Sequence, residues 1–393
     1  MLRVTSPRSN PARRRSRGVI RSVLMLTATA LLAAGCSSSG NADTATPNSG
    51  DGKLADAVKL ASAALTSYPV PTDALAGVST LKGKTVYYIP ITLQAHQFSI
   101  TGAALRKALG TVGVKLQICN GNSNPSDVTA CVTQATAASA GAIIADSIPY
   151  GLAANAFGAA QAKKIPVLIT DQIPDPTHPA SATLGYIQGA GSDMLKAVAD
   201  WIINDSDGKA SVVINESTDS PSTQAYVAAA QEEFKAQCSG CTVAINKISS
   251  ANFPLIASST SSALLRNPNA KYLVSEFDQY LQPTLGGAQQ SGKMMTLKGV
   301  SSAAGASGLQ MLKSKNFLSV DAGQASAYQG WAVADAAFRL MLGKSLPTYT
   351  IPIRLFTRDN ISSVTVSDAA EASGEWFGPT DFPAKFASLW GAS

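Results

Sequence analysis

The sequence predicts an α/β protein built as two doubly wound lobes of parallel sheet that are joined by a three-strand hinge. Two observations lead to this prediction. From Lys84 onward, apolar segments alternate with amphipathic ones at intervals of roughly 25 to 30 residues, which is typical of right-handed crossovers onto a parallel sheet. The alternation supplies too many strands for one sheet, and a second series begins near Leu184. Each series is therefore expected to form its own lobe.

The individual elements follow from the pattern of apolar residues. Strand segments are almost continuously apolar, as strands covered on both faces are, and helix segments carry apolar residues at helical spacing. The predicted strands are 85–91, 114–119, 141–146, 165–170, 210–215, 242–248, 271–277, 297–301 and 317–322. The predicted helices are 99–113, 126–140, 152–164, 193–205, 222–237, 258–267, 280–292, 305–315 and 328–344.

The N-terminal segment has the layout of an export signal. Seven arginines and no acidic residue precede a short apolar run that begins at Val23, and small residues follow it. The string AAGC at 33–36 resembles the lipobox of bacterial lipoproteins. The resemblance implies that residues 1–35 are removed, and that Cys36 carries lipid and anchors the exported protein to the outer face of the cell membrane. An ordinary secretory signal that contains a cysteine is the alternative.

The charge balance changes once this leader is set aside. The sequence has 31 Lys and Arg against 25 Asp and Glu, and removing the seven leader arginines leaves 24 basic residues and a net charge of −1. The basic pI therefore gives no reason to expect a nucleic-acid partner. Residues 37–51 are small or polar and predict a flexible tether. With a short helix at 54–68 and a second linker, residues 36–81 are expected to form a lipidated cysteine, tether and stalk.

The sequence shows no recognisable catalytic or metal-binding motif. Its two histidines, His96 and His178, lie in predicted loops that are far apart in the chain. It contains no zinc-protease motif, no metal-spaced cysteine set, no phosphate loop and no nucleophile elbow. We therefore expect neither enzymatic activity nor a bound metal or cofactor.

Six strings between residues 82 and 360 carry a family resemblance through their order and spacing. They are YYIPITLQAHQFSITGAAL at 87–105, IPVLITDQ at 165–172, KYLVSEFDQYLQPTLGGAQQSG at 271–292, LKGVSSAAG at 297–305, VDAGQASAYQGWAVADAAF at 320–338 and PIRLFTRDN at 352–360. Together they resemble the type I periplasmic binding proteins, in the sugar-binding branch that serves ABC importers. The resemblance implies a solute receptor whose partners are a small molecule and the subunits of an ABC permease.

The resemblance also implies which residues face the solute. The matched positions are His96, Phe98, Asp171, Gln172, Phe277, Ser301 and Gln324, with Tyr150 after the third strand and Ser217 and Asp219 after the first strand of the second lobe. Aromatic side chains would stack on apolar ring faces, while Asp, Gln and Ser would take hydroxyl groups in hydrogen bonds. The alternatives are that Phe98 only plugs the base of its helix, and that Ser217 and Asp219 only form a helix-capping turn.

The matched positions depart from the family in ways that bear on the solute. Gln172 stands where the family has an arginine, Phe277 where it has an asparagine, and Ser301 where it has an aspartate. No Lys or Arg occupies a matched position, so an anionic solute is disfavoured. We expect a small, uncharged sugar-like or aromatic-bearing solute.

Four cysteines besides Cys36 are expected to form local disulfides in an oxidising compartment. Cys119 and Cys131 flank a polar loop, and Cys238 and Cys241 flank a turn between a helix and a strand. A redox role for the second pair is disfavoured, because a redox motif starts a helix after a strand. The pairs Cys119–Cys131 and Cys238–Cys241 are therefore predicted.

The predicted division assigns 82–187 and 325–354 to the N-terminal lobe, and 188–324 and 355–393 to the C-terminal lobe. The three crossings are expected near 186–189, 324–326 and 354–357. A monomeric receptor for an ABC importer is the favoured function. The alternatives are a tethered sensor that passes ligand occupancy to a membrane signalling partner, and an enzyme on the same scaffold.

Overall fold

The computed structural model describes residues 49–392. These residues belong to one compact unit, and the predicted leader and Cys36 lie outside them. Among the described residues, none of the helices combines the length and the apolar character that a membrane span requires.

The first lobe is built around a five-stranded parallel sheet with the strand order β2-β1-β3-β4-β5. Its central strands are fully buried, as the apolar character of the sequence predicts. The strands are β1 (Thr85–Pro90), β2 (Lys115–Ile118), β3 (Ala142–Asp146), β4 (Val167–Thr170) and β5 (Leu184–Ile187). The helices that connect them are α2 (His96–Gly110), α3 (Pro125–Ala137) and α4 (Ala154–Ala162).

The second lobe contains a six-stranded sheet with the order β11-β10-β9-β8-β6-β7, parallel except for the edge strand β11. Its strands are β6 (Ser211–Ser217), β7 (Thr242–Ile248), β8 (Tyr272–Ser275), β9 (Lys298–Ser302), β10 (Leu318–Gln324) and β11 (Ile353–Thr357). Its helices are α5 (Gly191–Asp205), α6 (Pro221–Gln237), α7 (Ile256–Arg266), α8 (Leu281–Gln290) and α9 (Ala306–Lys313). The predicted fold class of two parallel-sheet α/β lobes is confirmed.

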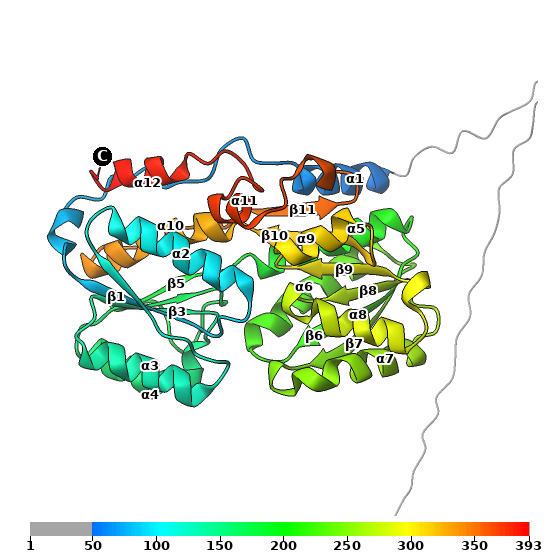
Figure 1. The fold of residues 1–393 in the computed structure, drawn as a ribbon, viewed down its shortest axis with the longest axis horizontal. Helices are drawn as coiled ribbons and strands as arrows, with labels where there is room; N and C mark the ends of the chain where they lie inside the picture. The colour runs from blue at the N-terminus through cyan, green and yellow to red at the C-terminus, as the bar shows by residue number, and fades with distance from the viewer. Residues whose placement is uncertain (1–48, 393) are drawn as a thin grey trace, which may run out of the picture. The chain divides into compact units, whose positions relative to one another are not determined.

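The chain passes between the lobes at three neighbouring places. It leaves the first sheet after Ile187, and it returns after Gln324 through α10 (Ser326–Met341), which packs beside α2 (Figure 1). The third passage lies in 342–352, ahead of β11, rather than at the predicted 354–357, because 353–357 is already paired with β10. The N–H of Ala325 donates to the carbonyl of Pro352 over 2.9 Å, which ties two of the passages together.

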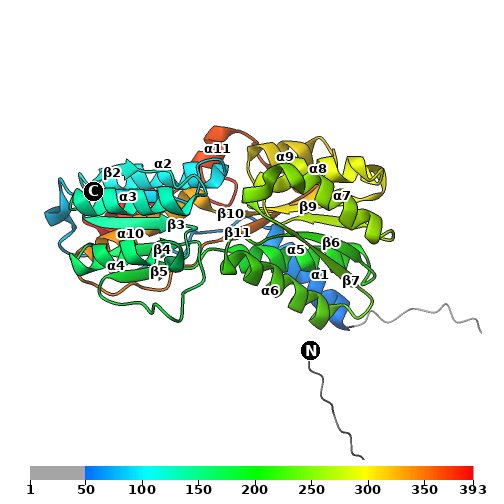
Figure 2. The same ribbon diagram turned by 90° about the horizontal axis from the view of Figure 1, so that it is seen from below.

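The segment that the sequence predicted to be a stalk packs against both lobes. Helix α1 (Ser49–Ser62) lies beside α5 and β11 of the second lobe (Figure 2). Further along, the ring of Tyr68 stacks on Tyr328 of α10 with ring centroids 4.9 Å apart. The hydroxyl of Tyr328 donates to the carbonyl of Pro69 over 2.7 Å. Residues 49–81 are therefore part of the folded body, so the predicted tether of 37–51 is wrong at 49–51, which begin α1, and the rest of it lies outside the described residues.

The position of the C-terminal helix also differs from the predicted division into lobes. Helix α12 (Phe382–Leu389) packs against α10, which covers the first sheet, although 355–393 was assigned to the second lobe. The cause is aromatic packing, because Phe386 and Trp390 stack on Trp331 of α10. Such pairs add roughly 0.5–1.5 kcal/mol each beyond the area that they bury.

Both predicted disulfides are present in the structure. Cys119 and Cys131 join the end of β2 to α3, with 5.7 Å between their Cα atoms. Cys238 and Cys241 close the turn between α6 and β7, with 5.4 Å between their Cα atoms. These separations lie within the range that disulfide geometry requires.

Candidate functional site

A cavity of about 540 Å³ is lined by residues of both lobes. Most lining residues come from the loops that follow the carboxyl ends of β1, β2, β3 and β4 in the first lobe, and of β6, β7, β8 and β9 in the second. This is the edge at which doubly wound sheets bind ligands. Seven of the ten sequence-predicted residues line the cavity: His96, Phe98, Asp171, Ser217, Asp219, Phe277 and Gln324.

His96 and Phe98 reach the cavity from the first turn of α2. This helix begins at His96 rather than at the predicted residue 99, and its N-cap residue Ala95 makes no side-chain capping bond, so the sequence held no capping signal there. Phe98 is only 4% exposed. The Nε2 atom of His96 lies 2.9 Å from a carboxylate oxygen of Glu371 in α11 (Asp368–Ser373).

Asp171 is held at the cavity by contacts from several parts of the fold. Its backbone adopts φ of 55°, a left-handed conformation that few residues other than glycine adopt. One carboxylate oxygen accepts a hydrogen bond from Gln329 Nε2 over 2.7 Å, and the other lies 3.5 Å from Gln324 Nε2. Burial raises the pKa of the Asp171 carboxyl, while these amides and Asp146 act against the rise.

A Cβ atom on Gly189 would lie 2.1 Å from the Asp171 carboxylate. Glycine is therefore required at the first passage between the lobes, because any side chain there would displace Asp171.

On the second lobe, Asp219 is fixed by a ring of donors. It accepts hydrogen bonds from the hydroxyls of Tyr280 and Ser249 and from the backbone N–H of Ser250. Burial acts to raise the pKa of Asp219, but the hydrogen bonds prevail and hold it below its ordinary value. Ser220, one residue on, caps α6. Both interpretations of this turn are therefore observed, because Ser220 caps α6 while Ser217 and Asp219 line the cavity.

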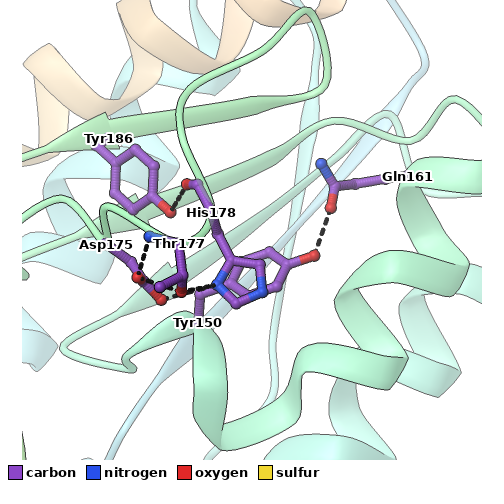
Figure 3. A network of polar contacts seen from close by, with 6 residues as sticks. All are labelled: Tyr150, Gln161, Asp175, Thr177, His178 and Tyr186. Atoms are coloured by element: carbon purple, nitrogen blue, oxygen red, sulfur yellow. Dashed lines mark hydrogen bonds and ion pairs between the residues drawn. The ribbon is translucent and has the colours of Figure 1, made fainter.

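Tyr150 lies outside the cavity lining, in a separate polar cluster of the first lobe (Figure 3). Its hydroxyl donates to Gln161 over 2.7 Å, and its ring stacks on His178 with centroids 4.2 Å apart. His178 is paired through Nδ1 with Asp175 over 2.8 Å. These contacts hold the 171–184 loop on the sheet, so the contacts of Tyr150 in the structure are with the protein and not with the cavity.

Gln172 and Ser301 also lie outside the lining. Gln172 is buried and accepts a hydrogen bond from Ser222 of α6 over 2.8 Å, which links the two lobes. Ser301 is fully buried and donates to Asp278 over 2.6 Å. Both positions are therefore one layer behind the cavity surface.

The structure places further residues at the site that the sequence analysis did not assign to it. Tyr226, Asp278 and Tyr280 line the cavity, and two fully buried acids, Asp146 and Asp321, lie behind it. The signal for the buried acids was in the sequence, because each interrupts or ends an otherwise apolar strand.

One group within the described residues has the composition of a metal site. The ligand atoms of His96, Asp368 and Glu371 lie within 4.8 Å of one another. In the structure the imidazole is engaged with Glu371, as a hydrogen-bonded pair at the rim of the cavity.

Residues 86–345 match the family model described as a periplasmic binding protein domain. The chain belongs to the periplasmic binding protein family. Comparison with curated protein sequences gives no significant match. The family resemblance inferred from the sequence is confirmed, and solute binding rather than catalysis is the family's role.

Several solved binding proteins share the fold. One, a 5-methylthioribose transporter solute-binding protein from Thermotoga lettingae, has a TM-score of 0.65 and 16% identity over 78% of this chain and 97% of its own. Another, from Agrobacterium vitis and bound to α-D-tagatopyranose, has a TM-score of 0.63 and 18% identity over 72% and 97%. The Caulobacter myo-inositol binding protein has a TM-score of 0.63 and 16% identity over 75% and 98%. At these identities the likeness shows the fold alone.

Proposed function

We propose that this chain is a membrane-tethered solute-binding protein that captures a small sugar-like or aromatic-bearing solute between its lobes and delivers it to an ABC permease. The observation that carries the proposal is a single cavity with walls from both lobes, at the carboxyl ends of both sheets. Because one chain supplies both walls, a monomer suffices for binding. The structural relatives include proteins recorded with tagatopyranose and myo-inositol.

The mechanism follows from the arrangement of the walls. Phe98 and Asp171 come from the first lobe, whereas Phe277 and Asp219 come from the second. A solute that touches both walls makes more contacts when the lobes are closed, so it shifts the population toward the closed state. The three neighbouring passages between the lobes can act as the hinge of that motion.

The clamp is tested by small-angle scattering of the mature protein with a solute found by thermal-shift screening. Binding should reduce the radius of gyration of the protein. Phe98→Ala should weaken solute binding by about 1–3 kcal/mol, because stacking on the ring is lost. Leu265→Ala, at an exposed position of α7 outside the cavity lining, serves as the control. Tight binding without compaction would contradict the clamp.

The tether is tested separately at Cys36. A lipidated cysteine would keep the receptor at the membrane, close to its permease. Several acyl chains anchor a protein firmly, whereas a single chain binds the membrane only marginally. Cys36→Ser should release the protein into the medium. Persistence of the variant in the membrane fraction would exclude lipid anchoring at this residue.

A further inference from the structure

The ionisable residues that line the cavity are almost all acidic. Asp171, Asp219, Asp278 and Asp368 contribute four carboxyl groups, and His96 is the one basic side chain. Among the described residues, the lining contains neither lysine nor arginine. The cavity therefore presents an excess of negative charge to anything that enters it.

Three further carboxyl groups lie directly behind this lining. Asp146, Glu276 and Asp321 are each fully buried. Glu276 accepts a hydrogen bond from the N–H of Ser217 through one oxygen, while its other oxygen has no partner among the described residues. Neither carboxyl oxygen of Asp321 receives a hydrogen bond there. The second layer thus adds acidic groups without adding positive charge.

Such an arrangement is costly when the cavity is empty and closed. A carboxylate that is withdrawn from water requires donors or a counter-charge. Burial raises the pKa of Asp278 to about 6, against the opposing hydrogen bonds of Ser301 and Gly305. A positively charged ligand would supply the counter-charge that the protein itself lacks at this place.

The aromatic residues of the cavity suit the same kind of ligand. Phe98, Tyr226, Phe277 and Tyr280 all line it, and the negative face of an aromatic ring attracts a cation within about 6 Å. The volume of about 540 Å³ is that of a small-molecule site.

We propose that the solute is an organic ammonium ion, carrying its amine or quaternary nitrogen on a sugar-like or aromatic frame. The inference rests on the proposed function, since it names the solute class of the same cavity. It replaces the sequence-based expectation of an uncharged solute, which considered only the matched positions, and it agrees with the sequence-based argument against an anion.

The test uses pairs of probes that differ in charge and share a frame. D-Glucosamine is compared with D-glucose and N-acetyl-D-glucosamine, tyramine with tyrosol, and choline with uncharged dimethylbutanol. Titration calorimetry and thermal shift are measured on the full mature chain. At least one cationic probe should bind about tenfold or more tightly than its neutral counterpart, as a charge-assisted contact predicts.

Variants then locate the charge. Asp278→Asn should weaken binding of that cationic probe by about tenfold and affect its neutral counterpart less. Asp381→Asn removes the same charge at an exposed position that pairs with Lys385 over 2.9 Å, and it should leave binding unchanged. Asp171→Asn, on the opposite wall, makes the same test if Asp278→Asn does not fold.

The outcomes separate this inference from the proposed function. If neutral probes bind and compact the protein while the cationic probes do not, the ammonium inference is overturned and the solute clamp stands. If Asp278→Asn and Asp171→Asn strengthen binding of the cationic probe, the inference is also overturned. If neither class of probe binds, both proposals fail.

Discussion

Each lobe carries a pair of neighbouring carboxyl groups near the carboxyl ends of its strands, and the two pairs are held differently. In the first lobe, Asp146 ends β3 and Asp171 follows β4. Asp146 accepts hydrogen bonds from the hydroxyls of Tyr88 and Thr170, and Asp171 accepts from Gln329. Both members of this pair are therefore supplied with donors by the protein.

In the second lobe, Asp278 follows β8 and Asp321 lies within β10. Asp278 accepts hydrogen bonds from Ser301 and from the N–H of Gly305. Asp321 has no donor among the described residues, and burial followed by the charge of Asp278 raises its pKa well above the ordinary value. A hydrogen bond between these two carboxyl groups requires that one of them holds a proton.

The difference separates two uses of a buried acid. The first pair organises its lobe, because it ties β1, β3 and β4 and the start of α10 together through hydrogen bonds. The second pair has no lysine or arginine beside it in the cavity lining that the structure describes, and keeping a proton on Asp321 at pH 7 costs stability. The same type of substitution is therefore expected to have opposite effects in the two lobes.

The largest effect is expected from Asp146→Ala in the first pair. The change leaves the Thr170 hydroxyl buried without its acceptor, at a cost of roughly 1–3 kcal/mol, and it leaves the Tyr88 hydroxyl only the carbonyl of Phe98 at 3.2 Å. We expect the free energy of unfolding in urea to fall by about 3 kcal/mol. Asp56→Ala, at an exposed position of α1, is the control and should change it by less than about 0.5 kcal/mol. A loss of less than about 1 kcal/mol for Asp146→Ala would show that the network is dispensable.

The disulfides give a second comparison between the lobes. Cys119–Cys131 spans 12 residues in the first lobe, and Cys238–Cys241 spans 3 in the second. Loop-closure entropy assigns them stabilisations of about 3 and about 2 kcal/mol. Replacing each pair with serine and measuring urea unfolding should reproduce that order. The reverse order would mean that native packing rather than the unfolded chain determines the loss.

The sequence was sufficient to predict both lobes and most of the cavity. The alternation of apolar and amphipathic segments is a local property, and His96 and Phe98 follow a recognisable strand. The long-range contacts were not accessible in this way. The prolines and small residues around Pro69 look like a linker, and nothing local indicates that Tyr68 stacks on Tyr328 in a helix 260 residues later.

The three predicted site residues that lie outside the cavity lining share a physical reason for their position. Tyr150, Gln172 and Ser301 lie in the correct loops or strands but point to protein partners instead of the cavity. The direction of a side chain depends on contacts that are remote in sequence, and matching strings carry no information about them. The acidic cavity was missed because its members come from several separate loops.

A smaller effect, of opposite sign to that of Asp146→Ala, is expected from Asp321→Asn. The amide replaces a carboxyl that burial and Asp278 keep protonated in the native state, and it can donate to Asp278, so at pH 7 the protein should gain about 1–2 kcal/mol. The pKa of Asp278 is about 6 when folded against an ordinary 3.8. Between those values the unfolded chain ionises while the native state keeps its proton, so stability should fall as pH rises from about 4 to about 6.

Thermal unfolding from pH 4 to pH 7 measures this slope. Asp321→Asn should flatten it, because burial and Asp278 raise the pKa of Asp321 well above its ordinary value, and the variant removes this carboxyl from the titration. A variant that is less stable than the parent at pH 7 would show that Asp321 has a stabilising partner.

The smallest effect is expected from Ser301→Ala, which removes one donor from the second pair. The Ser301 hydroxyl lowers the pKa of Asp278 by hydrogen bonding to the charged form, so the variant should lose about 1 kcal/mol of stability at pH 7. The loss should vanish near pH 4, where Asp278 is protonated in the native state of both the parent and the variant. Because Ser301 lies behind the cavity lining, affinity for a bound solute should change by less than about threefold. A tenfold loss of affinity with no change in stability would instead restore the sequence-based interpretation, in which Ser301 contacts the solute directly.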